Sequence, residues 1–183
     1  MTWIDYLGIS LLIIYTFGGF FTGVIRRLIG LVALYIALLA ATNMGLQAGN
    51  ILQQSSNFNV ADGRVYGFFG ILTAILVIVE AATQLAHGQI QIPALLFNNA
   101  LGAVVGLITS VVLAVIVVYE LGAASAPFGG SQLDPVQQHI RDAYQGSHIV
   151  VPIVHQIQKP IVQLFAPALP PDPQIYFGPN PAV

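Results

Sequence analysis

The chain has 183 residues, of which 56% are hydrophobic and 7% are charged. An average soluble domain carries about 25% charged residues, so this composition excludes an ordinary water-soluble globule. Five Lys and Arg against seven Asp and Glu give a net charge of -2, which lacks the basic field that nucleic-acid binding requires, and the absence of cysteine excludes disulfides and thiolate chemistry.

Long apolar runs predict four membrane-spanning helices. Residues 7–25, 28–46 and 100–119 contain no charge, and residues 65–86 contain only Glu80. Each run is close to the ~20 residues that cross a bilayer core. We therefore predict an all-α, integral membrane four-helix bundle in residues 1–122 and an amphipathic, proline-broken tail in residues 123–183. The spans are expected at about residues 3–25, 26–47, 64–86 and 99–121.

The connection between the first two spans carries Arg26 and Arg27. Two residues would make a very tight helical hairpin, and the glycines before them offer a longer turn. If the first helix ends near Gly18 and the chain turns through residues 19–23, the arginines fall on the first turn of the second helix. We expect their side chains to extend to the lipid headgroups.

Small residues recur at helical spacing within the spans. Lipid provides no hydrophobic force between helices, so membrane bundles are held together by close approach over small residues. We interpret the pattern as packing within one chain, with a homodimer face as the alternative. The predicted packing residues are Gly19, Gly23, Ala37, Gly67, Gly102, Gly106 and Ser110.

Glu80, Asn98 and Asn99 are the candidate polar sites within the spans. An unpaired intramembrane carboxylate costs about 2.5 kcal/mol or more. Glu80 lies six residues before Ala86, where the helix is expected to end and the carboxylate can reach water or a headgroup; an ion or proton role is the alternative. The two amides open the last span, where we expect them to cap the helix or bond a neighbour, with substrate contact as the alternative.

Two further acids have structural interpretations. Glu120 closes the fourth apolar run beside Tyr119, and we expect it at the membrane interface. Asp5 lies beside Trp3 and Tyr6, and we expect it to complement the dipole of the first helix.

No metal, cofactor or enzymatic activity is predicted. The three tail histidines are nine and seven residues apart, whereas helical ligand pairs usually lie three or four apart. These residues are His139, His148 and His155. The chain also contains no Gly-x-Ser-x-Gly motif of a hydrolase.

Within the tail, Asp134 followed by Pro135 predicts the start of a short helix. Pro152 and Pro160 are expected to prevent a single regular helix over residues 148–165, which we place along the membrane surface or against the bundle. Residues 167–183 are expected to be extended or disordered.

Four motifs occur in order: Trp3-Ile4-Asp5-Tyr6, the Gly23-x-x-Arg26 step, Leu101-Gly102-x-x-x-Gly106 at the start of the last span, and Ser131-Gln132-Leu133 followed by proline in the tail. In order, spacing and total size the sequence resembles the bacterial colicin V production protein (CvpA) family. Members of that family introduce the last span with an Asp-Arg pair. This chain has Asn98 and Asn99 there, which keeps the shape and removes the charge.

The resemblance implies a small inner-membrane protein linked to colicin V production or secretion and to envelope homeostasis. We predict a non-enzymatic accessory or scaffold protein. The alternative is a small transporter or channel component that uses Glu80 as an ion or proton site, although a pathway usually needs more polar or broken helices. The expected partners are the lipid bilayer, other membrane or secretion proteins, and a second copy of the chain; no nucleic acid is expected.

The distribution of basic residues predicts an orientation. Arg26 and Arg27 lie at one end of the spans, whereas Arg64 alone follows the loop at residues 47–63. Some members of the family carry a serine protease domain outside the cytoplasm after the same four helices. We therefore predict that both termini and the tail are extracytoplasmic, with the two arginines and the turn around His87 in the cytoplasm.

Overall fold

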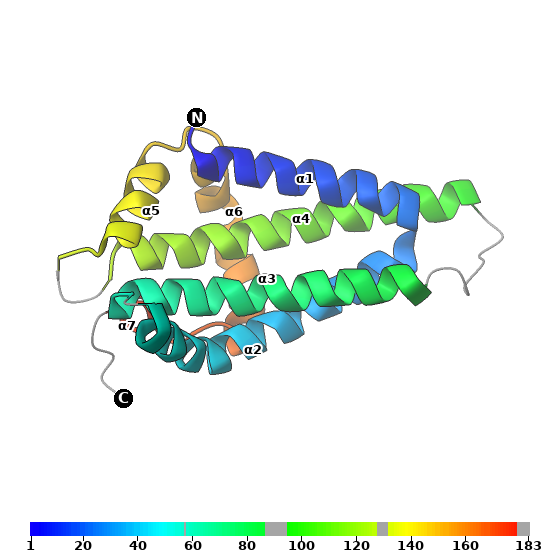
Figure 1. Cartoon of the computed structure of the whole chain (residues 1–183). Coiled ribbons are helices and arrows are strands. Elements are labelled where there is room, and N and C mark those ends of the chain that lie inside the picture. Colours follow the sequence, from blue (N-terminus) through cyan, green and yellow to red (C-terminus); the bar gives the residue numbers. More distant parts are fainter. Residues whose placement is uncertain (57, 87–94, 128–131, 179–183) are drawn as a thin grey trace.

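The structure, a computed structural model, describes residues 1–56, 58–86, 95–127 and 132–178, which form helices and no strands. Four of the helices are long and apolar enough to cross a membrane, and they run alternately up and down in chain order (Figure 1). They are α1 (Trp3–Thr22), α2 (Val24–Ser56), α3 (Val60–Ala86) and α4 (Leu95–Ser125). The predicted helical membrane bundle is confirmed.

The helix ends differ from those predicted by the apolar runs. α2 continues to Ser56 and α3 begins at Val60, so most of the expected loop at residues 47–63 is helical. A helix is continued by its own backbone hydrogen bonds, which need no apolar side chains once the chain has left the hydrocarbon. The expected turn through residues 19–23 is wrong, because α1 runs to Thr22 and Gly23 alone separates it from α2.

Two helix pairs form the bundle. α1 packs on α4 and α2 packs on α3, and contacts between α2 and α4 join the pairs. The buried core includes Leu34, Leu38, Phe68, Val115 and Ile116. Large apolar side chains on the outer faces of all four helices are exposed, as expected of helices surrounded by lipid.

Glycines allow the helix backbones of each pair to touch. A Cβ added to Gly102 would lie 2.8 Å from the Cα of Gly23, and one added to Gly67 would lie 2.7 Å from the backbone nitrogen of Gly49. No real side chain fits at such distances without moving a helix. The structure buries all seven of the predicted packing residues, namely Gly19, Gly23, Ala37, Gly67, Gly102, Gly106 and Ser110.

The tail begins with the helix that the sequence predicts. α5 (Pro135–Gln145) starts after Asp134, whose side chain and that of Gln137 form a capping box, and it ends at Gly146. A helix of 16 residues, α6 (Val150–Phe165), follows it at an angle of 95° and crosses the spans behind α4 (Figure 1). It packs on α4 and α1.

The prediction that two prolines would break this helix is wrong. Pro152 is the third residue of α6, where a backbone N–H has no partner within the helix, so its ring costs little there. Pro160 lies inside the helix and removes one hydrogen bond, and packing on the bundle outweighs that loss.

The C-terminal end also differs from the prediction of an extended or disordered segment. A 3-10 turn (Ala166–Ala168) and the short α7 (Pro173–Tyr176) fold back onto the spans, and Tyr176 and Phe177 join the core. Phe177 packs against the ring of Phe68 of α3, and the Tyr176 hydroxyl donates to the carbonyl of Ala41 at 3.1 Å. Residues 179–183 of the predicted segment lie outside the described residues.

Candidate functional site

A cluster of charged side chains lies where α1 turns into α2. Arg26 donates from Nη2 to Oε1 of Glu80 at 2.5 Å and to the Glu80 carbonyl at 3.2 Å. Arg27 Nη1 lies 3.8 Å from Oε2 of the same carboxylate. The side chains of Arg26 and Arg27 are 8% and 6% exposed, whereas that of Glu80 is 39% exposed. The structure therefore joins α2 to α3 through an ion pair that the sequence analysis did not predict.

The local geometry of the turn places both arginines on the bundle. Gly23 has a φ of 79°, a conformation that L side chains rarely adopt, and this permits reversal within one residue. The first N–H of α2, that of Val24, donates to Oδ1 of Asn98 at 3.2 Å. Asn98 thus bonds a neighbouring helix, one of the two structural roles expected for it. Asn99 is half-buried on the same turn of α4.

Arg27 reaches across to α1. Its guanidinium carbon lies 5.3 Å from the ring centroid of Tyr15, within the range of a cation–π contact. Gly18, three residues further along α1, leaves the space for this guanidinium, because a Cβ there would collide with Nη2 of Arg27. The side chains of both arginines turn inward onto Glu80 and Tyr15, and their expected reach to the lipid headgroups stays a prediction.

The chemistry of this cluster is governed by its charge balance. Two guanidinium groups face one carboxylate, which leaves one positive charge in excess. The Glu80 carboxylate lies within ion-pair distance of both arginines. Glu80 is therefore held as a counter-ion of the arginines, whereas a lone acid near a helix end would simply reach for water.

Asp5, at the opposite end of the bundle, caps two helices. Its Oδ2 accepts the backbone N–H of Thr2 at 3.0 Å, which completes the capping box of α1. Its Oδ1 accepts the N–H groups of Ile149 and Val150 at 3.2 and 3.0 Å, at the start of α6. The first-turn position was expected from the sequence, but nothing local indicated the second helix.

Glu120 is a further buried acid at this end. The residue is enclosed by the fold, because it is 0% exposed and, among the described residues, neither carboxylate oxygen has a hydrogen-bond partner. The reason is that α4 does not end with the apolar run but continues to Ser125, and α7 packs on it there. The expected position of Glu120 at the membrane interface stays a prediction.

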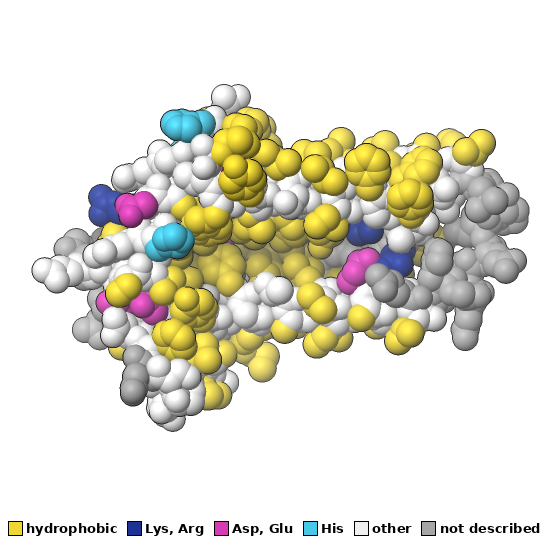
Figure 2. Space-filling view, turned by 45° about the horizontal axis from the view of Figure 1, so that its top comes forward, with side chains coloured by type: hydrophobic (Ala, Val, Ile, Leu, Met, Phe, Trp, Pro, Cys, Tyr) yellow, Lys and Arg dark blue, Asp and Glu magenta, His cyan; other side chains and the backbone are white. Residues whose placement is uncertain are grey.

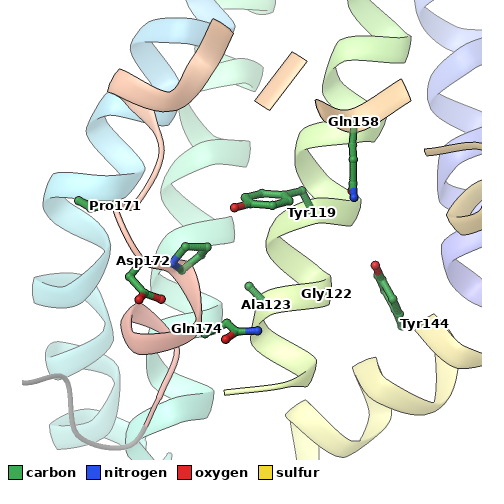
Figure 3. Close-up of a pocket in the computed structure, with 9 residues that line it drawn as sticks. Tyr119, Gly122, Ala123, Tyr144, Gln158, Pro171, Asp172 and Gln174 are labelled. Carbon is green, nitrogen blue, oxygen red and sulfur yellow. The ribbon is translucent and has the colours of Figure 1, made fainter. Parts of the chain in front are cut away.

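A cavity of about 480 Å³ opens beside this acid, between α4 and the tail elements. Tyr119 projects into it from α4, Gln158 from α6 and Gln174 from α7 (Figure 3). Tyr144 of α5 lines it as well, and burial raises the pKa of this phenol, so it stays protonated. Its oxygen lies 2.7 Å from Nε2 of His155.

The other histidines serve separate contacts. His139 stacks on Trp3 with ring centroids 6.3 Å apart, and His148 is exposed. Among the residues that the structure describes, no group of three or more His, Asp or Glu side chains could hold a metal ion.

These features define a class of protein, a four-span helical membrane protein whose spans are joined by an ion pair and whose tail is folded onto them. The sequence matches the family model described as Colicin V production protein over residues 4–155, and the chain belongs to this family. The resemblance seen in the sequence motifs is thereby confirmed. Neither the curated proteins nor the solved structures that were compared include a match.

Proposed function

We propose that the protein is a non-enzymatic accessory or scaffold protein of the bacterial inner membrane that supports colicin V production and envelope homeostasis. Family membership points to the role in colicin V production. The observation that supports a scaffold is the use made of the polar groups in the spans. Glu80, Asn98 and Asp5 each bond another helix of the same chain, so these groups act in assembly of the bundle.

The experiment compares a scaffold with a transporter through one variant. In a strain that lacks the protein, full-length wild type and Glu80→Gln are expressed at equal membrane levels, and colicin V production and co-purified proteins are measured. A scaffold requires the folded bundle alone, so both forms should restore production and capture the same secretion or envelope proteins from native membranes.

A transporter that uses Glu80 gives the opposite result. Production would then fail with Glu80→Gln, and purified wild type in liposomes would carry an ion or proton flux that the variant lacks. Such a flux would replace the scaffold with the transport function.

A further inference from the structure

Arg27 is a buried cation that shares its counter-ion with a second arginine. The residue is 5% exposed, and its Nε–H is buried with no hydrogen-bond partner among the described residues. Its contacts are the face of Tyr15 and the distant Oε2 of Glu80. Buried charges in proteins are normally paired and hydrogen-bonded, whereas Arg27 shares the Glu80 carboxylate with Arg26 at a distance too long for a hydrogen bond.

Among the described residues, no carboxylate is given to Arg27 alone. Glu80 bonds mainly to Arg26: its Oε1 lies 2.5 Å from Nη2 of Arg26, whereas its Oε2 lies 3.8 Å from Nη1 of Arg27. Both arginines lie in the first turn of α2, where the positive end of the helix dipole adds to their charge. The cluster therefore carries a net positive charge that one further anion would balance.

The position of Arg27 indicates where the anion comes from. It follows the reversal at Gly23 by four residues, which is about 6 Å of helix rise. The headgroup region on each side of a bilayer is about 5 to 8 Å thick. The guanidinium thus lies within reach of the level at which phospholipid phosphates are found.

An apolar hollow leads from the cluster toward the middle of the spans. Figure 2 shows it between helices of the two pairs, with hydrophobic walls and with basic and acidic side chains at the end far from α5. It exists because α3 packs mainly on α2 and α1 packs mainly on α4, so the two pairs diverge on this side. The ion pairs of Glu80 with Arg26 and Arg27 form at that end.

We propose that this end of the bundle binds a phospholipid, with the phosphate on Arg27 and an acyl chain in the hollow. The phosphate supplies a hydrogen-bond acceptor for Arg27, and the excess positive charge of the cluster favours a lipid of net negative charge. Phosphatidylglycerol has this chemistry. Basic pockets between transmembrane helices are a recurrent means of recognising anionic headgroups.

The test measures the thermal unfolding of the full chain in an uncharged detergent with added dioleoyl phosphatidylglycerol. At saturation Tm should rise by about 5 °C. Phosphatidylcholine should give a smaller rise, since it has the phosphate without net charge. Dioleoylglycerol, which has the chains alone, and inorganic phosphate, which has the anion alone, should give none.

Two variants with opposite expected effects keep the test independent of folding yield. Arg27→Gln should lose the rise, while Arg141→Gln, an exposed arginine of α5, should keep it. Glu80→Gln should increase the rise, because the phosphate becomes the main counter-ion of both arginines. A full rise in Arg27→Gln, or no rise in Glu80→Gln, would overturn the proposal.

The probes also separate other occupants. An equal rise with inorganic phosphate would show a free-anion site, and an equal rise with dioleoylglycerol would show a chain site without headgroup recognition. A dimer in lipid-free detergent that dissociates in Arg27→Gln would place a second copy in the hollow. Each of these results would replace the phospholipid.

Discussion

Oδ1 of Asp5 accepts a hydrogen bond of 2.5 Å from the hydroxyl of Ser147, although 142 positions separate the two residues. The same carboxylate oxygen accepts the backbone N–H of Val150 at the start of α6. Ser147 Oγ accepts the backbone N–H of Val151. One buried acid therefore fixes the start of the first span against the start of the tail helix.

Replacing this acid should loosen the tail. Asp5→Asn removes the charge and one acceptor, so the N–H groups at the start of α6 compete for a single amide oxygen. We expect the free energy of unfolding in detergent to fall by about 2 kcal/mol. Asp142→Asn, an exposed acid of α5, is the matched control and should leave it unchanged. Equal stability of both variants would show that Asp5 does not hold α6.

Gly106 tests the packing of α1 on α4. A Cβ there would lie 3.0 Å from the carbonyl carbon of Tyr15, so Gly106→Leu should push the helices apart and lower Tm and the yield of folded protein. Gly70→Leu is the control, because a Cβ at Gly70 meets nothing within 4 Å. If both variants behave alike, Gly106 faces lipid.

Glu80→Gln should leave membrane insertion intact, because the amide is of equal size and carries no charge. Folded stability should nevertheless fall, because Arg26 loses its counter-ion. In a double-mutant cycle with Arg26→Gln we expect a coupling of about 1 kcal/mol, a modest value because the carboxylate is 39% exposed. Zero coupling would mean that the carboxylate reaches solvent independently of Arg26.

Tyr176 should make the fold sensitive to alkaline pH. Burial raises the pKa of its phenol, and the nearby Glu120 carboxyl adds to this effect, so the unfolded chain ionises first. The contribution of Tyr176 to the free energy of unfolding is therefore fully present below about pH 10 and is lost as the pH rises above that value. Tyr176→Phe should be slightly less stable at pH 8 but lose less of its Tm between pH 8 and 11. A slope equal to that of wild type would exclude Tyr176 as a source of the pH dependence.

The orientation is tested by cysteine labelling. Because the chain has no native cysteine, only the introduced residue can react. Gln132→Cys, just before α5, should react with a membrane-impermeant maleimide in intact cells. A cysteine at Ser131, which lies outside the described residues, should react in the same way. His87→Cys, also outside them, should react only after lysis. The reverse pattern would invert the topology.

The basic residues near the spans are balanced between the two sides of the membrane. α4 runs to Ser125, so Arg141 follows it by only 16 residues and falls within the distance over which basic residues direct insertion. Arg141 and Arg64 then give two basic residues on one side of the membrane, equal to Arg26 and Arg27 on the other. The prediction therefore rests on the arrangement of the fused proteases in the family.

The sequence by itself determined the number and approximate position of the spans. Their apolar length is a local property, because each stretch of about 20 residues is solvated by the bilayer on its own. The cap at Asp134 was predictable for the same reason, since N-cap, proline and glycine lie within one short segment.

Only the tertiary structure decided which polar residues meet. Glu80 finds Arg26 54 positions away, and Phe177 reaches Phe68 from a segment that composition alone describes as disordered. These contacts depend on α1 pairing with α4 and α2 with α3. Hydropathy does not encode that choice, because lipid solvates all four helices alike and the partners are selected by backbone approach at glycines and by the few buried polar groups.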